Sequence, residues 1–134
     1  MILIDTNIVF ALQIESAHSP AAHALLARDP DMRTESHALV ELTNVLARYV
    51  RARLMSVDEA LAALGRAENQ LQGSVVSVAH ADALQIALER KISAYDARFL
   101  AAASALGVKL VTEDVKLRTA APDLAQSLAE ALAA

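Results

Sequence analysis

Four acidic residues, far apart in the sequence, stand where they could do chemistry together. The first, Asp5, directly follows the apolar run Ile2–Ile4, which is typical of a short buried strand, and precedes Thr6 and Asn7. Either of these two polar residues can cap the helix whose apolar pattern begins at Ile8. Capping does not explain Asp5, because a lone carboxylate buried at a strand end is costly. Asp5 is therefore the first candidate functional residue.

The other three acids lie in comparable settings further along the chain. Glu41 belongs to a predicted helix with apolar neighbours, and Asn44 shares its face three residues on. Asp96 and Asp114 each stand at the end of a predicted strand. The carboxyl ends of parallel strands meet at one edge of an open α/β sheet, where ligands bind. We therefore expect the aspartates at one edge of the sheet, with Glu41 joining them from its helix.

Taken singly, each acid also has an ordinary explanation as a helix cap or as one half of a salt bridge. Caps have no reason to gather at one place, however, and two carboxylates 4 Å apart repel each other by about 4 kcal/mol at an effective dielectric constant near 20. The nearby sequence holds too little fixed positive charge to cancel several such pairs. A divalent cation would cancel them, and ligation by oxygen alone suits Mg²⁺ or Mn²⁺ rather than zinc.

The elements that must position these acids are predicted from helix caps and apolar periodicity. Helices are expected from Ser19 to about Asp29, from about Ser36 through the Glu41 segment, and from the capping box at Ser56 to about Gln72. Beyond Gly73, strands over residues 75–79, 92–95 and 109–112 alternate with helices over residues 80–91, 97–107 and 115–120, before a last helix over residues 123–134. This alternation predicts a parallel sheet covered on both faces by helices.

The composition is that of one domain with a substantial core. The chain has 134 residues, of which 55% are apolar, and it has no cysteine, so disulfides and thiolate chemistry are excluded. No apolar run approaches the roughly 20 residues of a membrane span, and no signal peptide is evident, so we expect a cytoplasmic protein. The formal charge of −4 argues against a generic basic nucleic-acid binder. It does not argue against a nucleic-acid enzyme that obtains positive charge from a metal.

Four motifs follow one another in order along the chain. They are Asp5-Thr6-Asn7 after a strand, Glu41 with Asn44 in an E-x-x-N-like helix, the block Tyr95–Ala103, and Thr112-Glu113-Asp114 at a strand end. In this order the chain resembles the PIN-domain family, and specifically the VapC-type toxins of bacterial toxin–antitoxin pairs, over residues 1 to about 120. The resemblance implies a PIN-like three-layer α/β/α fold with a central, mainly parallel sheet of four to five strands, in one domain over residues 1–134. Some relatives carry a further aspartate where this chain has Lys116.

The resemblance implies a metal-dependent endoribonuclease that hydrolyses RNA phosphodiester bonds and, as a toxin, inhibits translation. One or two Mg²⁺ or Mn²⁺ ions would be held by Asp5, Glu41, Asp96 and Asp114. Asp5 and Asp96 would be direct ligands, Glu41 would orient the attacking water, and Asp114 would act through water or from outside the first ligand sphere. Supporting or substrate-contacting side chains would be Thr6, Asn7, Asn44, Thr112, Arg98 and Lys116. The implied partners are RNA, a cognate antitoxin and a second copy of the chain, with no membrane.

Two other functions compete with this one. A catalytically silent PIN-like scaffold could bind RNA or protein without cutting, but it would have no reason to keep four mutually repelling acids. A phosphatase of another α/β family would use the aspartate after its first strand as a nucleophile, but it usually needs a second aspartate two residues later, where this chain has Asn7. Cleavage of DNA also stays open, because the metal chemistry does not read the 2′-hydroxyl group.

Overall fold

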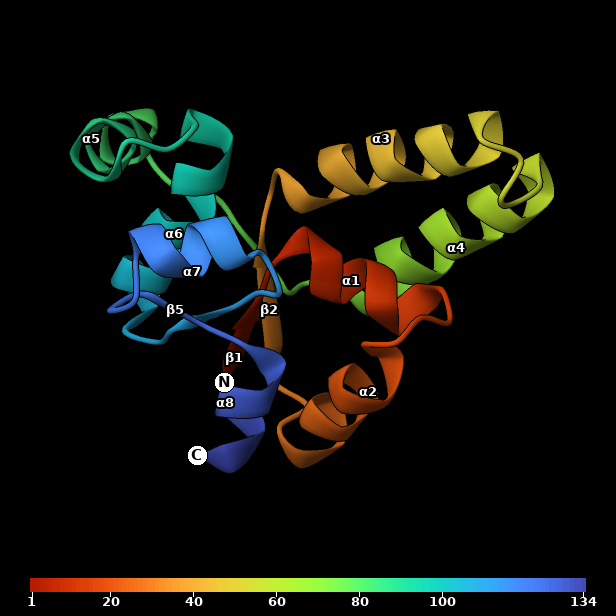
Figure 1. The fold of residues 1–134 in the computed structure, drawn as a ribbon, viewed down its shortest axis with the longest axis horizontal. Coiled ribbons are helices and arrows are strands. Elements are labelled where there is room, and N and C mark those ends of the chain that lie inside the picture. The colour runs from red at the N-terminus through yellow and green to blue at the C-terminus, as the bar shows by residue number, and fades with distance from the viewer.

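The computed structural model describes residues 1–134 and has a five-stranded sheet between two layers of helices (Figure 1). All the strand pairs are parallel, in the order β3-β2-β1-β4-β5. The strands are β1 (Ile2–Ile4), β2 (Met32–Glu35), β3 (Val75–Val76), β4 (Leu110–Val111) and β5 (Ala125–Gln126). The expected three-layer α/β/α architecture with four to five strands is confirmed, and the sheet is entirely parallel.

Eight helices cover the two faces of this sheet. They are α1 (Thr6–Gln13), α2 (Ser19–Arg28), α3 (Ala38–Arg51), α4 (Val57–Gln70), α5 (His80–Arg90), α6 (Ala94–Leu106), α7 (Val115–Ala120) and α8 (Leu128–Ala133). Figure 1 shows α1 to α4 on one side of the strands and α5 to α7 on the other, with α3 and α4 extending outward as a helical hairpin. None of the helices combines the length and the apolar character needed to cross a membrane.

Two hydrophobic clusters, one on each face of the sheet, fix the register of the central strands. Leu3 and Leu110 are partners in the β1–β4 pair and belong to the cluster under α6 and α7. Ile4 and Val111 are the next partners and belong to the cluster under α1 to α4. This alternation is the two-residue period of a strand buried on both faces. It brings the residues that follow, Asp5 and Thr112, side by side at the carboxyl edge.

One predicted strand is wrong, and two strands were not predicted. Residues 92–95 do not form a strand: Ile92 and Ser93 connect α5 to α6, and the Ser93 Oγ accepts a hydrogen bond from the Asp96 amide (3.1 Å) as the N-cap of α6. Serine is a strong N-cap, and here capping determines the local structure. The unpredicted strands, β2 and β5, are short and rich in polar residues, and parallel pairing with distant strands stabilises them.

Candidate active site

The four predicted acids line one pocket of about 380 Å³ at the carboxyl edge of the sheet. Asp5 follows β1 and is the N-cap of α1, the place expected for Thr6 or Asn7, because its carboxylate accepts the Thr6 amide. Glu41 lies in the first turn of α3, and Asp114 is the N-cap of α7. Asp96 comes from the first turn of α6 rather than from a strand end, which corrects the setting expected for it. The pocket lies beside β1 and β4, where the strand order reverses, and such a switch point is the usual binding crevice of an open parallel sheet. The other lining residues are Thr6, Asn7, Phe10, Ser16, His18, Val45 and Tyr49.

Asp5 is almost fully buried, with 6% of its surface exposed, and it is held by hydrogen bonds. Its Oδ1 accepts a hydrogen bond from the Thr6 amide at 2.7 Å, and its Oδ2 accepts one from the Thr112 hydroxyl at 2.8 Å. The pKa of Asp5 is raised to about 6, chiefly by burial; the hydrogen bonds from Thr112 and Thr6 oppose the rise, and the charges of Glu41 and Asp96 add to it. The protein thus orients this carboxylate firmly while leaving its charge poorly compensated.

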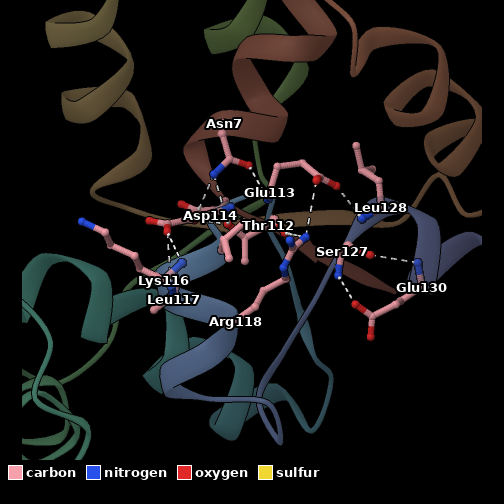
Figure 2. Close-up of polar contacts among 12 residues, drawn as sticks. Asn7, Thr112, Glu113, Asp114, Lys116, Leu117, Arg118, Ser127, Leu128 and Glu130 are labelled. Carbon is pink, nitrogen blue, oxygen red and sulfur yellow. Dashed lines mark hydrogen bonds and ion pairs between the residues drawn. The ribbon is translucent and has the colours of Figure 1, made fainter.

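The Thr112 hydroxyl joins the loop after β4 to the start of α1. It donates to Asp5 and accepts hydrogen bonds from the Asn7 side-chain amide at 3.0 Å and from the Asp114 backbone amide at 3.1 Å. Asn7 in turn accepts a hydrogen bond at its Oδ1 from the Glu113 amide at 3.1 Å (Figure 2). Thr112 and Asn7 therefore fix the two segments that carry Asp5 and Asp114 relative to each other.

Glu41 and Asp96 face the pocket from helices on opposite sides of the sheet. The Glu41 Oε2 accepts a hydrogen bond from the Thr6 hydroxyl at 2.8 Å, and its Oε1 lies 3.9 Å from the His37 Nε2. Burial raises the pKa of Glu41, and the charge of Asp96 adds to the rise. Burial also raises the pKa of Asp96, with a contribution from the charge of Asp114. These carboxyl groups repel one another in the folded chain.

Asp114 is both a helix cap and part of the pocket wall. Its Oδ1 accepts hydrogen bonds from the amides of Lys116 at 2.9 Å and Leu117 at 3.2 Å, at the start of α7 (Figure 2). Its Oδ2 takes part in no hydrogen bond within the chain. Asp114 is therefore both the N-cap of α7 and one of the four acids of the pocket.

The structure places the remaining predicted residues differently. Asn44 is exposed and does not line the acidic pocket. Lys116 is exposed beside Asp114, and its amino group has no partner in the chain. Arg98, expected to contact a substrate phosphate, is instead engaged inside the protein: its Nη2 lies 2.8 Å from Glu35 Oε1 and only 14% of its side chain is exposed. The Glu35 contact is thus a role for Arg98 that the sequence did not indicate.

Glu35, at the carboxyl end of β2, was not among the predicted residues. It is fully buried, and besides Arg98 it accepts hydrogen bonds from the Ser36 hydroxyl at 2.8 Å and from the His37 amide at 2.6 Å. Burial raises the pKa of Glu35, but the hydrogen bonds from Arg98 and from the His37 amide outweigh this effect, and the pKa lies below its usual range. The sequence signal was an acid closing the four-residue stretch Met32–Glu35, which was too short and too polar to be predicted as a strand.

The pocket suits a hard divalent cation in the chemistry of its donors. It is lined by four carboxylates and by no lysine or arginine. Burial and mutual repulsion disfavour the charged forms of Asp5, Glu41 and Asp96 and raise their pKa. A bound cation would stabilise these negative charges. No three His, Asp or Glu side chains are grouped tightly enough to form a ready-made ligand set. An ion such as Mg²⁺, which keeps several of its waters, could be held through water as well as directly.

The fold and the pocket define a class of protein: a doubly wound parallel α/β domain with an acidic crevice at its switch point. The chain belongs to the PIN-domain family, whose family model matches residues 2–121. It is similar to Ribonuclease VapC3 of Pyrobaculum aerophilum, with 28% identity over 126 residues that cover 92% of this chain and 96% of that protein.

Solved structures show the same fold. The crystal structure of PAE2754 from Pyrobaculum aerophilum matches with a TM-score of 0.67 and 25% identity, covering 98% of this chain and 96% of the other. FitAcB from Neisseria gonorrhoeae matches with a TM-score of 0.69 and 20% identity, covering 95% and 96%. FitAB bound to an IR36 DNA fragment matches with a TM-score of 0.71 and 20% identity, covering 96% and 95%. The last two likenesses concern the fold alone.

Proposed function

We propose that this chain is a divalent-metal-dependent endoribonuclease and the toxin of a toxin–antitoxin pair. The observation that carries the proposal is the set of four carboxylates lining one pocket at the switch point of a PIN-domain sheet. The similarity to a VapC ribonuclease over nearly the whole chain supports RNA as the substrate. Inhibition of translation in a bacterial cytoplasm would be the cellular result of cutting RNA needed for protein synthesis.

The carboxylates would hold one or two Mg²⁺ or Mn²⁺ ions, and each has a separate task. When bound, such an ion supplies a water of lowered pKa and positive charge at the phosphate. Asp5, oriented through Thr112 and Thr6, acts as a direct ligand, and Asp96 acts as the second from across the sheet. Asp114 has one carboxylate oxygen committed to the cap of α7 and the other available to the pocket.

Glu41 is the residue we assign to orient the attacking water. Its Oε2 is fixed by the Thr6 hydroxyl, whereas its Oε1 has only the His37 ring at 3.9 Å. Burial raises the pKa of Glu41, so this carboxylate binds a proton more readily than an exposed glutamate does. Lys116, exposed next to Asp114, would contact a substrate phosphate.

Exposed apolar side chains on the helices support protein partners. On α4, Val57 and Leu61 are 59% and 63% exposed, and on α5, Leu84 and Leu88 are 57% and 72% exposed. Large apolar side chains gathered on a surface mark interaction sites. We propose an antitoxin and a second copy of this chain as the partners of these helices.

One domain would extend over residues 1–134. The last helix, α8, lies beyond the residues that the family model matches. Its Leu128 and Ala131 nevertheless belong to the same hydrophobic cluster as Ile4 and Val111 of the central strands, and α8 contacts α2. This packing supports a single folding unit that includes the C-terminal helix.

The test is cleavage of a mixed tRNA and rRNA substrate by the purified, antitoxin-free protein with Mg²⁺, Mn²⁺ or EDTA. A single-stranded DNA of matched length would be run in parallel. We expect cutting of RNA that needs the metal and falls at least 100-fold in Asp5→Asn and Asp96→Asn. The control is Asp123→Asn, which removes an exposed acid outside the pocket and should leave the rate unchanged. Cutting in EDTA, or full activity of Asp5→Asn, would refute the metal site. A folded protein that cuts nothing would make the silent scaffold the better proposal.

A further inference from the structure

A buried ion pair lies next to the acidic pocket without lining it. Glu35, at the end of β2, is fully buried, and the Arg98 side chain is 14% exposed. The Arg98 Nε and Nη2 approach the same carboxylate oxygen, Oε1, at 2.9 and 2.8 Å. Neither residue belongs to the pocket wall. Any effect of the pair on the pocket therefore acts through the segments that it joins.

On the Glu35 side, the pair controls the entry into α3. The Ser36 hydroxyl donates to the same Oε1 at 2.8 Å, and the His37 amide donates to Oε2 at 2.6 Å, so both carboxylate oxygens hold the turn that precedes the helix. The carbonyl of His37 accepts the Glu41 amide at 3.0 Å, which closes the first helical turn. Glu35 thus sets the position of the turn from which Glu41 extends into the pocket.

On the Arg98 side, the pair controls the start of α6. Arg98 lies two residues after Asp96 in that helix. Its Nη2 also donates to the Val78 carbonyl at 3.4 Å, and its Nη1 lies 3.1 Å from the Nδ1 of His80. The guanidinium therefore holds the first turns of α6 against β2 and against the segment that enters α5. Helices α3 and α6 cover opposite faces of the sheet, and this pair is a direct link between their beginnings.

We propose that Glu35 and Arg98 are positioning residues for the cation site, which hold the segments that carry Glu41 and Asp96 in place at the pocket. A buried ion pair loses much hydration on folding, and a well-packed apolar pair could stabilise the same region as well. The fixed direction of a guanidinium–carboxylate contact, however, gives geometry that an apolar contact does not. The proposal rests on the proposed metal-dependent function.

The experiment measures Mn²⁺ binding by electron paramagnetic resonance of the free ion, well below the melting temperature, beside RNA cleavage. Glu35→Gln removes the charge of the acid, and Arg98→Lys keeps the charge but loses the planar fork. The matched control is Asp123→Asn, which breaks the exposed Arg90–Asp123 pair with its contacts of 2.6 and 2.8 Å. We expect both site variants to bind Mn²⁺ about tenfold more weakly, as removal of outer partners of metal ligands commonly does, and the control to match the wild type.

Each outcome is decisive. If Glu35→Gln and Arg98→Lys melt at lower temperature but bind Mn²⁺ as the wild type does, the pair is merely structural and the inference is wrong. If Glu35→Gln does not fold, the folded Arg98→Lys variant decides by the same criterion. A wild type that binds no Mn²⁺ and cuts no RNA refutes the proposed function and this inference with it. A wild type that binds and cuts, with unaffected variants, refutes the inference alone.

Discussion

The side-chain amide of Asn7 donates a hydrogen bond to the hydroxyl of Thr112 at 3.0 Å, although the two residues are 105 positions apart in the sequence. The contact joins the segments that follow β1 and β4, the two strands between which the order of the sheet reverses. The same hydroxyl donates to Asp5 at 2.8 Å. One threonine side chain therefore ties the start of α1 to the segment that follows β4 at the pocket.

Thr112→Val should damage both the stability and the activity of the protein. Valine has the same shape, but it removes the hydroxyl that donates to Asp5 Oδ2 and that accepts hydrogen bonds from the amides of Asn7 and Asp114. We expect a loss of about 1–3 kcal/mol in the free energy of unfolding and a 10- to 100-fold lower cleavage rate. Urea unfolding and single-turnover cleavage measure the two effects. The control is Thr119→Val on α7, whose exposed hydroxyl bonds only the Val115 carbonyl and should matter little.

The metal-free protein should lose stability as the pH rises through the range set by Asp5. Its pKa is raised from 3.8 to about 6 in the fold, so the folded state binds more protons than the unfolded chain between these values. Stability then falls with rising pH in that window, by about 3 kcal/mol in total for this buried group. Asp5→Asn should therefore be more stable than the wild type at pH 7.5 and nearly equal to it at pH 4. Urea unfolding in EDTA tests this, and a difference that does not change with pH would contradict it.

Glu113→Gln should weaken the attachment of the C-terminal helix α8 without changing the rate of RNA cleavage. The Glu113 carboxylate accepts the Leu128 amide at 2.8 Å and lies 3.4 Å from the Arg118 guanidinium, pointing away from the acidic pocket (Figure 2). Its own backbone amide, which holds Asn7, is unaffected by the substitution. We expect a loss of about 1 kcal/mol and faster hydrogen exchange in α8, with a cleavage rate within threefold of the wild type. A 100-fold loss of cleavage would place Glu113 in the active site instead.

Lys116→Ala should weaken RNA binding in a salt-dependent way and leave the chemical step intact. Its amino group is exposed beside Asp114 and has no partner in the chain. Loss of one phosphate contact lowers the slope of log Kd against log salt concentration by about 0.7 for a single strand. Binding would be measured by fluorescence anisotropy in the Asp5→Asn background. The control, Lys109→Ala, removes the lysine that donates to the Pro122 carbonyl, and an equal change in slope there would refute a specific role for Lys116.

The features that could be predicted from the sequence are those that local chemistry determines. Asp5 stands out because it directly follows three apolar residues, although the expectation that Thr6 or Asn7 caps the next helix is wrong, since Asp5 itself is the N-cap of α1. The capping box that begins at Ser56 and the left-handed cap at Gly107 are also local, and the structure has both. Such signals need only a few consecutive residues, so a single sequence contains them in full.

The features that could not be predicted depend on contacts between distant segments. Glu35 is 63 positions from Arg98 in the sequence, and nothing around either residue indicates the other. The strand that carries Glu35 was missed because its pairing with β1 and β3, rather than its own composition, stabilises it. Residues 92–95 were misread for the opposite reason: the apolar Ile92 suggested a strand, whereas the Ser93 cap fixed a helix start. Arg98 is expected at the substrate because it lies two residues from Asp96, and only the fold reveals its buried partner Glu35.

The two outer strands of the sheet have a consequence for how copies of this chain can associate. Both β3 and β5 are only two residues long, so each edge offers few free amide and carbonyl groups to a strand from another molecule. Short edge strands are a recognised protection against edge-to-edge aggregation. Growth of fibrils or chains by strand addition is thereby disfavoured, even where the protein is concentrated. Association through the exposed apolar side chains of α4 and α5 would not need these edges.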